Sequence, residues 1–356
     1  MRKKWWLLVL LALIILYISG PRPSTPVYSP TMPVVPSGAA DLEKYISDQE
    51  ARHKLKTDNE ARIVWVNDTT RAKTECAIVY LHGFSASQKE GDPVHRYIAK
   101  KFGCNLYLSR MAEHGIDTVE AMVNLTADNY WASAQQALAI GRQLGNKVIL
   151  MGTSTGGTFA LQLAATYPDQ VAALVLLSPN IAINDPNAWL LNDHWGLQIA
   201  HMVTGSPYIK DTVDHGPVYP QYWYPKYRSE AAVALEELLE TTMNKTTFEK
   251  VKQPVGMFYF YKDETHQDSV VKVSASLKMF DELGTPAALK YKQAIPEAAT
   301  HVIGSSIRSH DVEGVEKGVA HFMSDVLKIP MMPDTLITTV RTDFIIHATK
   351  TRKRPD

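Results

Sequence analysis

The sequence has no excess of charge of either sign and very little cysteine. Lysine and arginine together number 37, as do aspartate and glutamate, so the formal net charge is zero. A balanced charge gives no reason to expect nucleic acid or a strongly acidic partner. With only two cysteines there is no zinc-type Cys/His cluster, and no phosphate-binding glycine loop or internal repeat is visible. We therefore expect no metal and no cofactor.

One short segment carries the clearest functional pattern. An apolar run at 148–151 precedes G-T-S-T-G at 152–156, and a helix-like segment follows as far as Tyr167. This is the G-x-S-x-G pattern in the strand–turn–helix context that it requires, where a strained turn projects the serine hydroxyl above the sheet edge. We therefore expect Ser154 to be a nucleophile.

An earlier loop contains groups suited to stabilising an oxyanion. The buried strand expected over 77–81 ends in His82-Gly83-Phe84. We expect the backbone N–H of Phe84 to be one oxyanion donor and that of Thr155, after the nucleophile, to be the other. We expect His82 to orient this loop and not to act in catalysis. A plain strand-to-loop junction is the alternative.

The acid is expected in the polar loop after the strand predicted over 255–261. Asp268 suits this role, which is to fix the tautomer of a catalytic histidine and to stabilise its charged form. Asp263 and Glu264 lie in the same loop and are the alternatives.

The base is expected after the last predicted strand, 288–294. His301 follows that strand on a loop from which it can reach the serine, although an ordinary structural histidine is the alternative. His310 and His321 lie in or near the next helix and are expected at the surface. His266 lies too near the expected acid in sequence to reach the nucleophile easily.

The resulting order, Ser154, Asp268, His301, is that of the α/β-hydrolases and differs from the orders of chymotrypsin-like and subtilisin-like proteases. With the motifs at 82–84 and 113–115, the chain resembles the α/β-hydrolase superfamily from its first strand pair to the helix after His301. The resemblance implies one of many activities, among them those of esterases, lipases, thioesterases, peptidases, dehalogenases and epoxide hydrolases. A serine nucleophile argues against the last two, which use aspartate.

Strand-like and helix-like segments alternate along the chain, which predicts an α/β fold with a mostly parallel central sheet and helices on both faces. Helices are expected from Thr126 to Leu144 and after Asp92, with Asp92 as N-cap and Pro93 at the first helical position. The strand-like segments are 63–66, 77–81, 105–109, 147–151, 171–177, 255–261 and 288–294.

Residues 181–250 are expected to form a cap, which the resemblance implies after the strand that follows the nucleophile. No strand is predicted between Pro179 and Pro254. The aromatic side chains of this segment either line an apolar acyl or alcohol pocket or only pack the cap onto the core. They are Trp189, Trp195, Tyr208, Tyr219, Tyr222, Trp223, Tyr224 and Tyr227.

The N-terminal segment, 1–20, predicts a membrane anchor or a signal peptide. Arg2-Lys3-Lys4 precede an apolar run over 5–18, which is short for a spanning helix of roughly 20 residues. We expect an uncleaved anchor with the rest of the chain outside the cytoplasm. A cleaved signal peptide, giving a secreted or periplasmic protein, is the alternative. The expected organisation continues with a proline-rich tether at 21–40, a hydrolase domain at 41–328 and a tail at 329–356.

Cys76 and Cys104 each open a predicted strand, and each stands six positions before the loop-side end of that strand. Matching registers on neighbouring parallel strands would place the two side chains roughly 5 Å apart. An oxidising compartment would then permit a disulfide. The alternative, favoured by residue type alone, is a pair of buried free thiols.

Three functions remain open from the sequence. The first is a serine hydrolase of carboxylic esters, acting on a small-molecule or lipid ester through an acyl-enzyme. The second is a serine peptidase of the same fold, such as an aminopeptidase, whose substrate ammonium would need an anchor among the cap's carboxylates. The third is an inactive relative that serves as a binding module, against which the intact set of Ser154, Asp268 and His301 argues.

Overall fold

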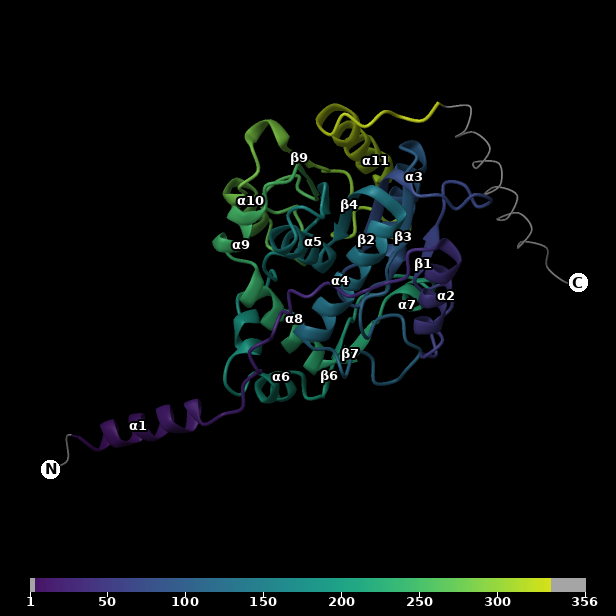
Figure 1. The fold of residues 1–356 in the computed structure, drawn as a ribbon. Coiled ribbons are helices and arrows are strands. Elements are labelled where there is room, and N and C mark those ends of the chain that lie inside the picture. The colour runs from purple at the N-terminus through teal and green to yellow at the C-terminus, as the bar shows by residue number, and fades with distance from the viewer. Residues whose placement is uncertain (1–3, 334–356) are drawn as a thin grey trace, which may run out of the picture.

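A seven-stranded sheet runs through the centre of the computed structural model, which describes residues 4–333 (Figure 1). Neighbouring strands pair in parallel, except that β1 is antiparallel to β3. The expected α/β fold with a mostly parallel sheet is therefore confirmed. In spatial order the strands are β1 (Arg62–Val64), β3 (Asn105–Leu108), β2 (Thr74–Leu81), β4 (Gly145–Thr153), β5 (Ala173–Leu177), β8 (Val255–Tyr259) and β9 (Lys290–Ala294).

Each face of the sheet has its own hydrophobic core. Along β2, Val79 and Leu81 belong to one core, whereas Ile78 and Tyr80 belong to the other, because successive side chains of a strand point to opposite faces. The first core includes residues of α2 (Ala39–Glu50), α4 (Ala127–Leu144), α5 (Thr155–Thr166), α8 (Ser229–Thr242), α9 (Lys245–Lys250) and α10 (Val273–Glu282). The second includes residues of α3 (Val94–Lys101) and α11 (Val312–His321).

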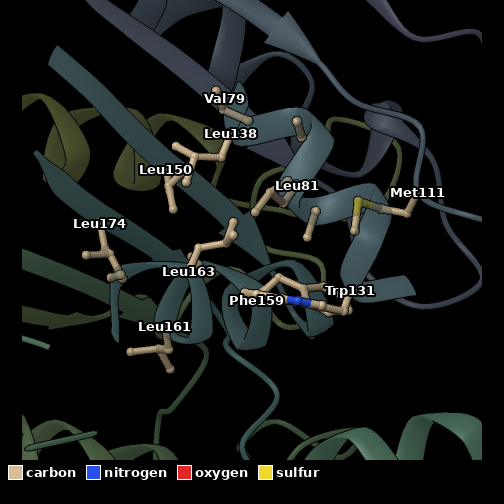
Figure 2. Packing of buried hydrophobic residues seen from close by; sticks show 14 of the residues in the cluster. Val79, Leu81, Met111, Trp131, Leu138, Leu150, Phe159, Leu161, Leu163 and Leu174 are labelled. Atoms are coloured by element: carbon tan, nitrogen blue, oxygen red, sulfur yellow. The ribbon is translucent and has the colours of Figure 1, made fainter. Parts of the chain in front are cut away.

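The first core holds α5, the helix that follows Ser154, in place. Figure 2 shows Trp131 and Leu138 of α4 and Phe159 and Leu163 of α5 gathered against strand residues such as Leu150 of β4. All of these side chains are essentially excluded from solvent. Removing apolar surface from water stabilises the fold by about 1.5–3 kcal/mol for each such side chain, so α5 is held firmly against the sheet.

Local signals place the helix ends, with one correction. Thr126, the expected start of this helix, is the N-cap of α4, and its side chain forms a reciprocal capping box with Asn129. The prediction that Asp92 caps the helix after it, α3, is wrong, because Pro93 occupies the N-cap of α3 and no side chain makes a cap hydrogen bond there. The carboxylate of Asp92 instead pairs with Lys89 and Arg96.

The segment assigned to the cap contains helices and also two short strands. The strands pair with each other in antiparallel fashion, apart from the central sheet, so the prediction of no strand between Pro179 and Pro254 is wrong. Three-residue strands are too short to give an alternating pattern. Lys226 and Arg228 of one strand lie over the ring of Tyr208 in the other. These elements are α6 (Gly196–Thr204), β6 (Tyr208–Lys210), α7 (Tyr219–Tyr222) and β7 (Lys226–Arg228).

The N-terminal apolar run forms α1 (Trp5–Ile18), which has no buried residue and extends away from the body in Figure 1. None of the helices in residues 4–333 combines the length and the apolarity needed to cross a membrane. Residues 21–37 are irregular and lie along the body. The Trp131 indole N–H donates to the Ser29 carbonyl at 3.0 Å, and the Tyr167 hydroxyl donates to the Pro30 carbonyl at 2.9 Å. At the other end, most of the expected tail, 329–356, lies outside the described residues.

Cys76 and Cys104 form a disulfide. The register of β2 against β3 pairs Ala77 with Asn105, which places the preceding cysteines opposite each other with their Cα atoms 4.9 Å apart. Both side chains are buried. The two strands therefore have the matching registers that the disulfide required, and the alternative of two free thiols does not hold.

Candidate active site

The sequence-predicted site residues gather at one edge of the central sheet. Strands β2, β4, β8 and β9 run in the same direction, so the loops that follow them leave from the same edge. The loop after β2 carries His82 and Phe84, and the turn after β4 carries Ser154. The loop after β8 carries Asp268, and the loop after β9 carries His301. This is the edge at which open α/β sheets place their ligands.

Ser154 occupies a strained turn between β4 and α5. Its φ is +54° and its ψ is −121°, a conformation that residues other than glycine rarely adopt. The neighbouring glycines permit the turn, because a Cβ on Gly156 would overlap the carbonyl oxygen of Leu81, and one on Gly152 would overlap the backbone of Gly156. The side chain of Ser154 is therefore held at the start of a helix in a fixed position, with 5% of the residue exposed.

Two buried histidines brace the loop expected to hold the oxyanion. His82 Nδ1 donates to the Gly83 carbonyl at 2.9 Å, and its Nε2 accepts the N–H of Met111 at 3.0 Å. His114 Nε2 accepts the N–H of Ser85 at 3.0 Å. Burial lowers the pKa of His82 to about 4, so its ring is neutral at pH 7 and can accept as well as donate. Both histidines thus support the loop, as expected of His82.

The two expected oxyanion donors have no hydrogen-bond acceptor within residues 4–333. Among the described residues, no hydrogen bond from the N–H of Phe84 is found. The N–H of Thr155 lies in the first turn of α5, where backbone N–H groups have no partner within the helix. Both groups are therefore available to a developing negative charge beside Ser154.

The structure brings Asp268 and His301 together. His301 Nδ1 lies 2.6 Å from Asp268 Oδ2, and their side chains are 9% and 1% exposed. The other carboxylate oxygen of Asp268 accepts the N–H groups of Val270 and Val271, which fixes its orientation. Burial opposes a charge on His301, but the Asp268 carboxylate more than offsets this effect and holds the pKa of His301 above its ordinary value.

The alternative residues lie elsewhere. Asp263 binds His266 at 2.9 Å, and both side chains are more than half exposed. The carboxylate of Glu264 accepts the hydroxyl of Tyr261 at 2.9 Å. His321, at the end of α11, pairs with Asp325 on the surface. Among the described residues, no hydrogen bond or ion pair joins any of these side chains to Asp268 or His301.

Ser154 Oγ and His301 form no direct hydrogen bond in the part of the chain that the structure describes. In ligand-free sites such bonds are often long and tighten only when substrate binds. The arrangement provides a strained hydroxyl, a carboxylate-oriented imidazole and two free N–H groups at one edge. Together these groups have the composition required for acyl transfer. Within residues 4–333, no group of three or more His, Cys, Asp or Glu side chains could hold a metal ion.

Aromatic residues of the segment expected to form a cap pack beside this edge. Tyr222 and Trp223 form a small buried cluster with Ala86 and Val302, the neighbours of the oxyanion loop and of His301. The N–H of Tyr224 donates to the carbonyl of Ser85 at 2.8 Å. These three aromatic residues are at most 9% exposed, so they pack this segment onto the rest of the structure. Trp189, in contrast, is 52% exposed.

Sequence reasoning missed one acidic side chain at this edge. Glu90 lies in the 3₁₀ turn η1 (Gln88–Gly91) and is 2% exposed. Its carboxylate accepts the N–H of Gly83, next to the expected oxyanion donor. The only signal in the sequence is an acidic residue seven positions after the glycine of the His-Gly-Phe motif, and this spacing does not reveal which way the side chain points.

Comparison with known proteins places the chain in a family. A model of the alpha/beta hydrolase fold family matches residues 75–349, and the chain belongs to this family. LipV, a lipase of Mycobacterium tuberculosis, is 43% identical over 58 residues. That match covers 15% of this chain and 22% of LipV, so it spans about a fifth of the relative.

Solved structures of lipolytic enzymes share the fold. The structure reported for the metagenome-derived lipolytic enzymes LipS and LipT has a TM-score of 0.60 at 16% identity, covering 76% of this chain and 99% of that one. A monoacylglycerol lipase of Paleococcus ferrophilus has a TM-score of 0.54 at 15% identity, and the match covers 74% of this chain and 97% of that one. A monoglyceride lipase of Saccharomyces cerevisiae has a TM-score of 0.56 at 13% identity, and the match covers 74% of this chain and 90% of that one. At these identities the likeness establishes the fold alone.

Proposed function

We propose that the protein is a serine hydrolase of carboxylic esters, similar to carboxylesterases and lipases, that acts through an acyl-enzyme on Ser154. One observation carries the proposal. Ser154 lies in a strained turn at the same sheet edge as the hydrogen-bonded pair of Asp268 and His301. Two N–H groups without acceptors, those of Phe84 and Thr155, complete the set that acyl transfer needs.

In the proposed mechanism, Ser154 Oγ attacks the ester carbonyl carbon while His301 Nε2 takes the hydroxyl proton. The carbonyl oxygen becomes an oxyanion that accepts the N–H groups of Phe84 and Thr155, each worth about 10²–10³ in kcat. Asp268 stabilises the imidazolium that forms. Collapse expels the alcohol, which takes the proton from His301. A water that gives a proton to His301 then attacks the acyl carbon, the bond from this carbon to Ser154 Oγ breaks, and the acid leaves while His301 returns the proton to Oγ.

An ester substrate fits better than a peptide with a free ammonium group. An aminopeptidase needs a carboxylate free to bind that ammonium, and the four aspartates of the expected cap, 181–250, already have partners nearby. Asp211 binds His215 at 2.8 Å, and the other three accept hydrogen bonds from residues within two positions of themselves. Those three are Asp185, Asp193 and Asp214. The lipolytic neighbours add support for an acyl ester as the substrate.

The test is a series of p-nitrophenyl esters from acetate to palmitate, compared with aminoacyl p-nitroanilides. We expect the full-length protein to hydrolyse esters and to leave the anilides essentially untouched. The matched control is Ser154→Ala, which should lose ester turnover without a change in its circular dichroism spectrum. Faster cleavage of an aminoacyl anilide than of any ester would favour the peptidase instead.

We also propose that residues 1–20 hold the chain at a membrane with the catalytic domain outside the cytoplasm. Three basic residues, 2–4, precede the exposed apolar helix α1, which is the arrangement of an anchor whose basic end stays inside. The Cys76–Cys104 disulfide adds support, because such bonds persist in oxidising compartments. A secreted or periplasmic form, released by cleavage, is the alternative.

A further inference from the structure

A carboxyl group outside the proposed set of Ser154, Asp268 and His301 lies beside the nucleophile. Glu90 is buried, and its Oε2 accepts a 2.5 Å hydrogen bond from the N–H of Gly83. A Cβ placed on Gly83 would lie 2.9 Å from Glu90 Oε1 and 2.9 Å from Ser154 Cβ. This carboxyl group and the Cβ of Ser154 therefore both border the space that a side chain on Gly83 would fill.

The segment that carries Glu90 also binds the loop after β9, which holds the catalytic histidine. The hydroxyl of Ser305 donates to the carbonyl of Lys89 at 2.9 Å. The N–H of Ser306 donates to the carbonyl of Asp92 at 2.9 Å. One short segment therefore joins the oxyanion loop to the histidine loop, and Glu90 lies at its centre.

The charge of Glu90 acts on the histidine. Burial raises the pKa of Glu90 to about 7, while the N–H of Gly83 and the charge on His301 lower it. Burial likewise opposes the charge on His301, and the carboxylates of Asp268 and Glu90 favour it. The groups that face Glu90 are the Gly83 N–H, His301 and the hydroxyls of Tyr80, Tyr130 and Tyr219. Those that face His301 are Asp268, Glu90 and Arg308.

A buried carboxyl group with a single hydrogen bond destabilises a fold relative to an apolar side chain of similar size. Packing alone therefore does not explain why a glutamate occupies this buried position. We propose that Glu90 is a positioning residue of the ester-hydrolase site. Its carboxylate fixes the Gly83 peptide that precedes the Phe84 donor, and its negative charge stabilises the imidazolium of His301.

This role rests on the proposed function and adds no step to it. The proton of Ser154 Oγ still passes to His301 Nε2 as the Oγ–C bond forms, and Glu90 neither gives nor takes a proton. Two effects follow from its position. The Phe84 N–H remains aimed at the oxyanion, and the base remains charged after it has accepted the proton.

The test compares Glu90→Ala and Glu90→Gln with the wild type in the full chain, using p-nitrophenyl butyrate as substrate. Glu90→Ala should lower kcat about 10- to 100-fold, the effect of misplacing one oxyanion donor, with KM within about threefold. Glu90→Gln should recover part of kcat, because its amide oxygen still accepts the Gly83 N–H. In Glu90→Gln, the rise of kcat/KM on the acidic side of the pH profile, its acidic limb, should move to lower pH, because the loss of a neighbouring anion lowers the pKa of His301.

Glu236→Gln is the matched control. Glu236 is also buried, and burial raises its pKa to about 7, but it lies on α8 of the cap and its charge acts on Glu240 and Asp185. This variant should keep the kinetics and the pH profile of the wild type. A shift of the acidic limb that appears only in Glu90→Gln separates the proposed role from a general effect of removing a buried charge.

Wild-type kcat and an unmoved acidic limb in both Glu90 variants would overturn the proposal. If Glu90→Ala loses its circular dichroism signal, the pH profile of Glu90→Gln is the test of the proposed role. A wild type that neither hydrolyses the ester nor reacts with a fluorophosphonate would contradict ester hydrolysis itself, and the role of Glu90 with it. An active wild type with unaffected Glu90 variants would contradict only the role of Glu90.

Discussion

Reduction of the Cys76–Cys104 disulfide should destabilise the protein by a predictable amount. The bond joins residues 28 positions apart. For a loop of this length, the chain-entropy relation gives about 12 cal/mol/K, or about 3.6 kcal/mol at 25 °C, through constraint of the unfolded chain. Because the two thiols would remain buried as small hydrophobic groups, reduction itself should remove little packing.

Equilibrium unfolding in urea, followed by tryptophan fluorescence with and without dithiothreitol, measures this difference. The bond is buried, so each sample should be unfolded and refolded to let the reductant reach it. The control is Cys76→Ala/Cys104→Ala, whose unfolding free energy should be the same in both conditions. A wild type that responds to reductant by less than about 1 kcal/mol would refute the reasoning, as would two alkylated thiols in non-reduced protein from its native compartment.

Three further predictions concern the site and the anchor. For an ester without titratable groups, kcat/KM should rise with pH through a midpoint above about 6.5, because protonated His301 cannot accept the serine proton and its pKa is raised; a lower midpoint would argue against this base. Asp268→Asn should lower kcat about 10⁴-fold, whereas Asp263→Asn should leave kcat nearly unchanged; the reverse result would move the acid. Carbonate-washed membranes should retain the full chain, and deletion of 1–20 should release it; recovery of the full chain only in the soluble cytoplasmic fraction would contradict the anchor.

Local pattern and chain order were enough to predict the fold and to single out residues that meet in space. Ser154 has a strand and a helix on its two sides, and Asp268 and His301 each follow a strand. Because the ends of parallel strands share one edge, residues in these positions come together whatever the details of the loops. Their catalytic roles stay predictions, since a static arrangement does not measure turnover.

What sequence reasoning missed depends on contacts between distant segments. The strands β6 and β7 are three residues each, too short for a periodic pattern. Glu90 turns inward because its carboxylate accepts a hydrogen bond from the N–H of Gly83 in the folded protein, a contact that no local pattern encodes. The sequence predicts the disulfide only as one of two possibilities, because the choice depends on the register of β2 against β3. The docking of the proline-rich segment depends on the contact of Trp131 with Ser29, more than a hundred positions away.

The central claim is that Ser154 is a nucleophile that forms an acyl-enzyme. The most direct measurement is reaction of the full chain with a fluorophosphonate, followed by peptide mass spectrometry to locate the adduct. We predict one adduct per chain on the peptide that contains Ser154, loss of ester turnover in proportion to labelling, and no adduct in Ser154→Ala. Labelling that is unchanged in Ser154→Ala, or full ester turnover in that variant, would contradict the claim.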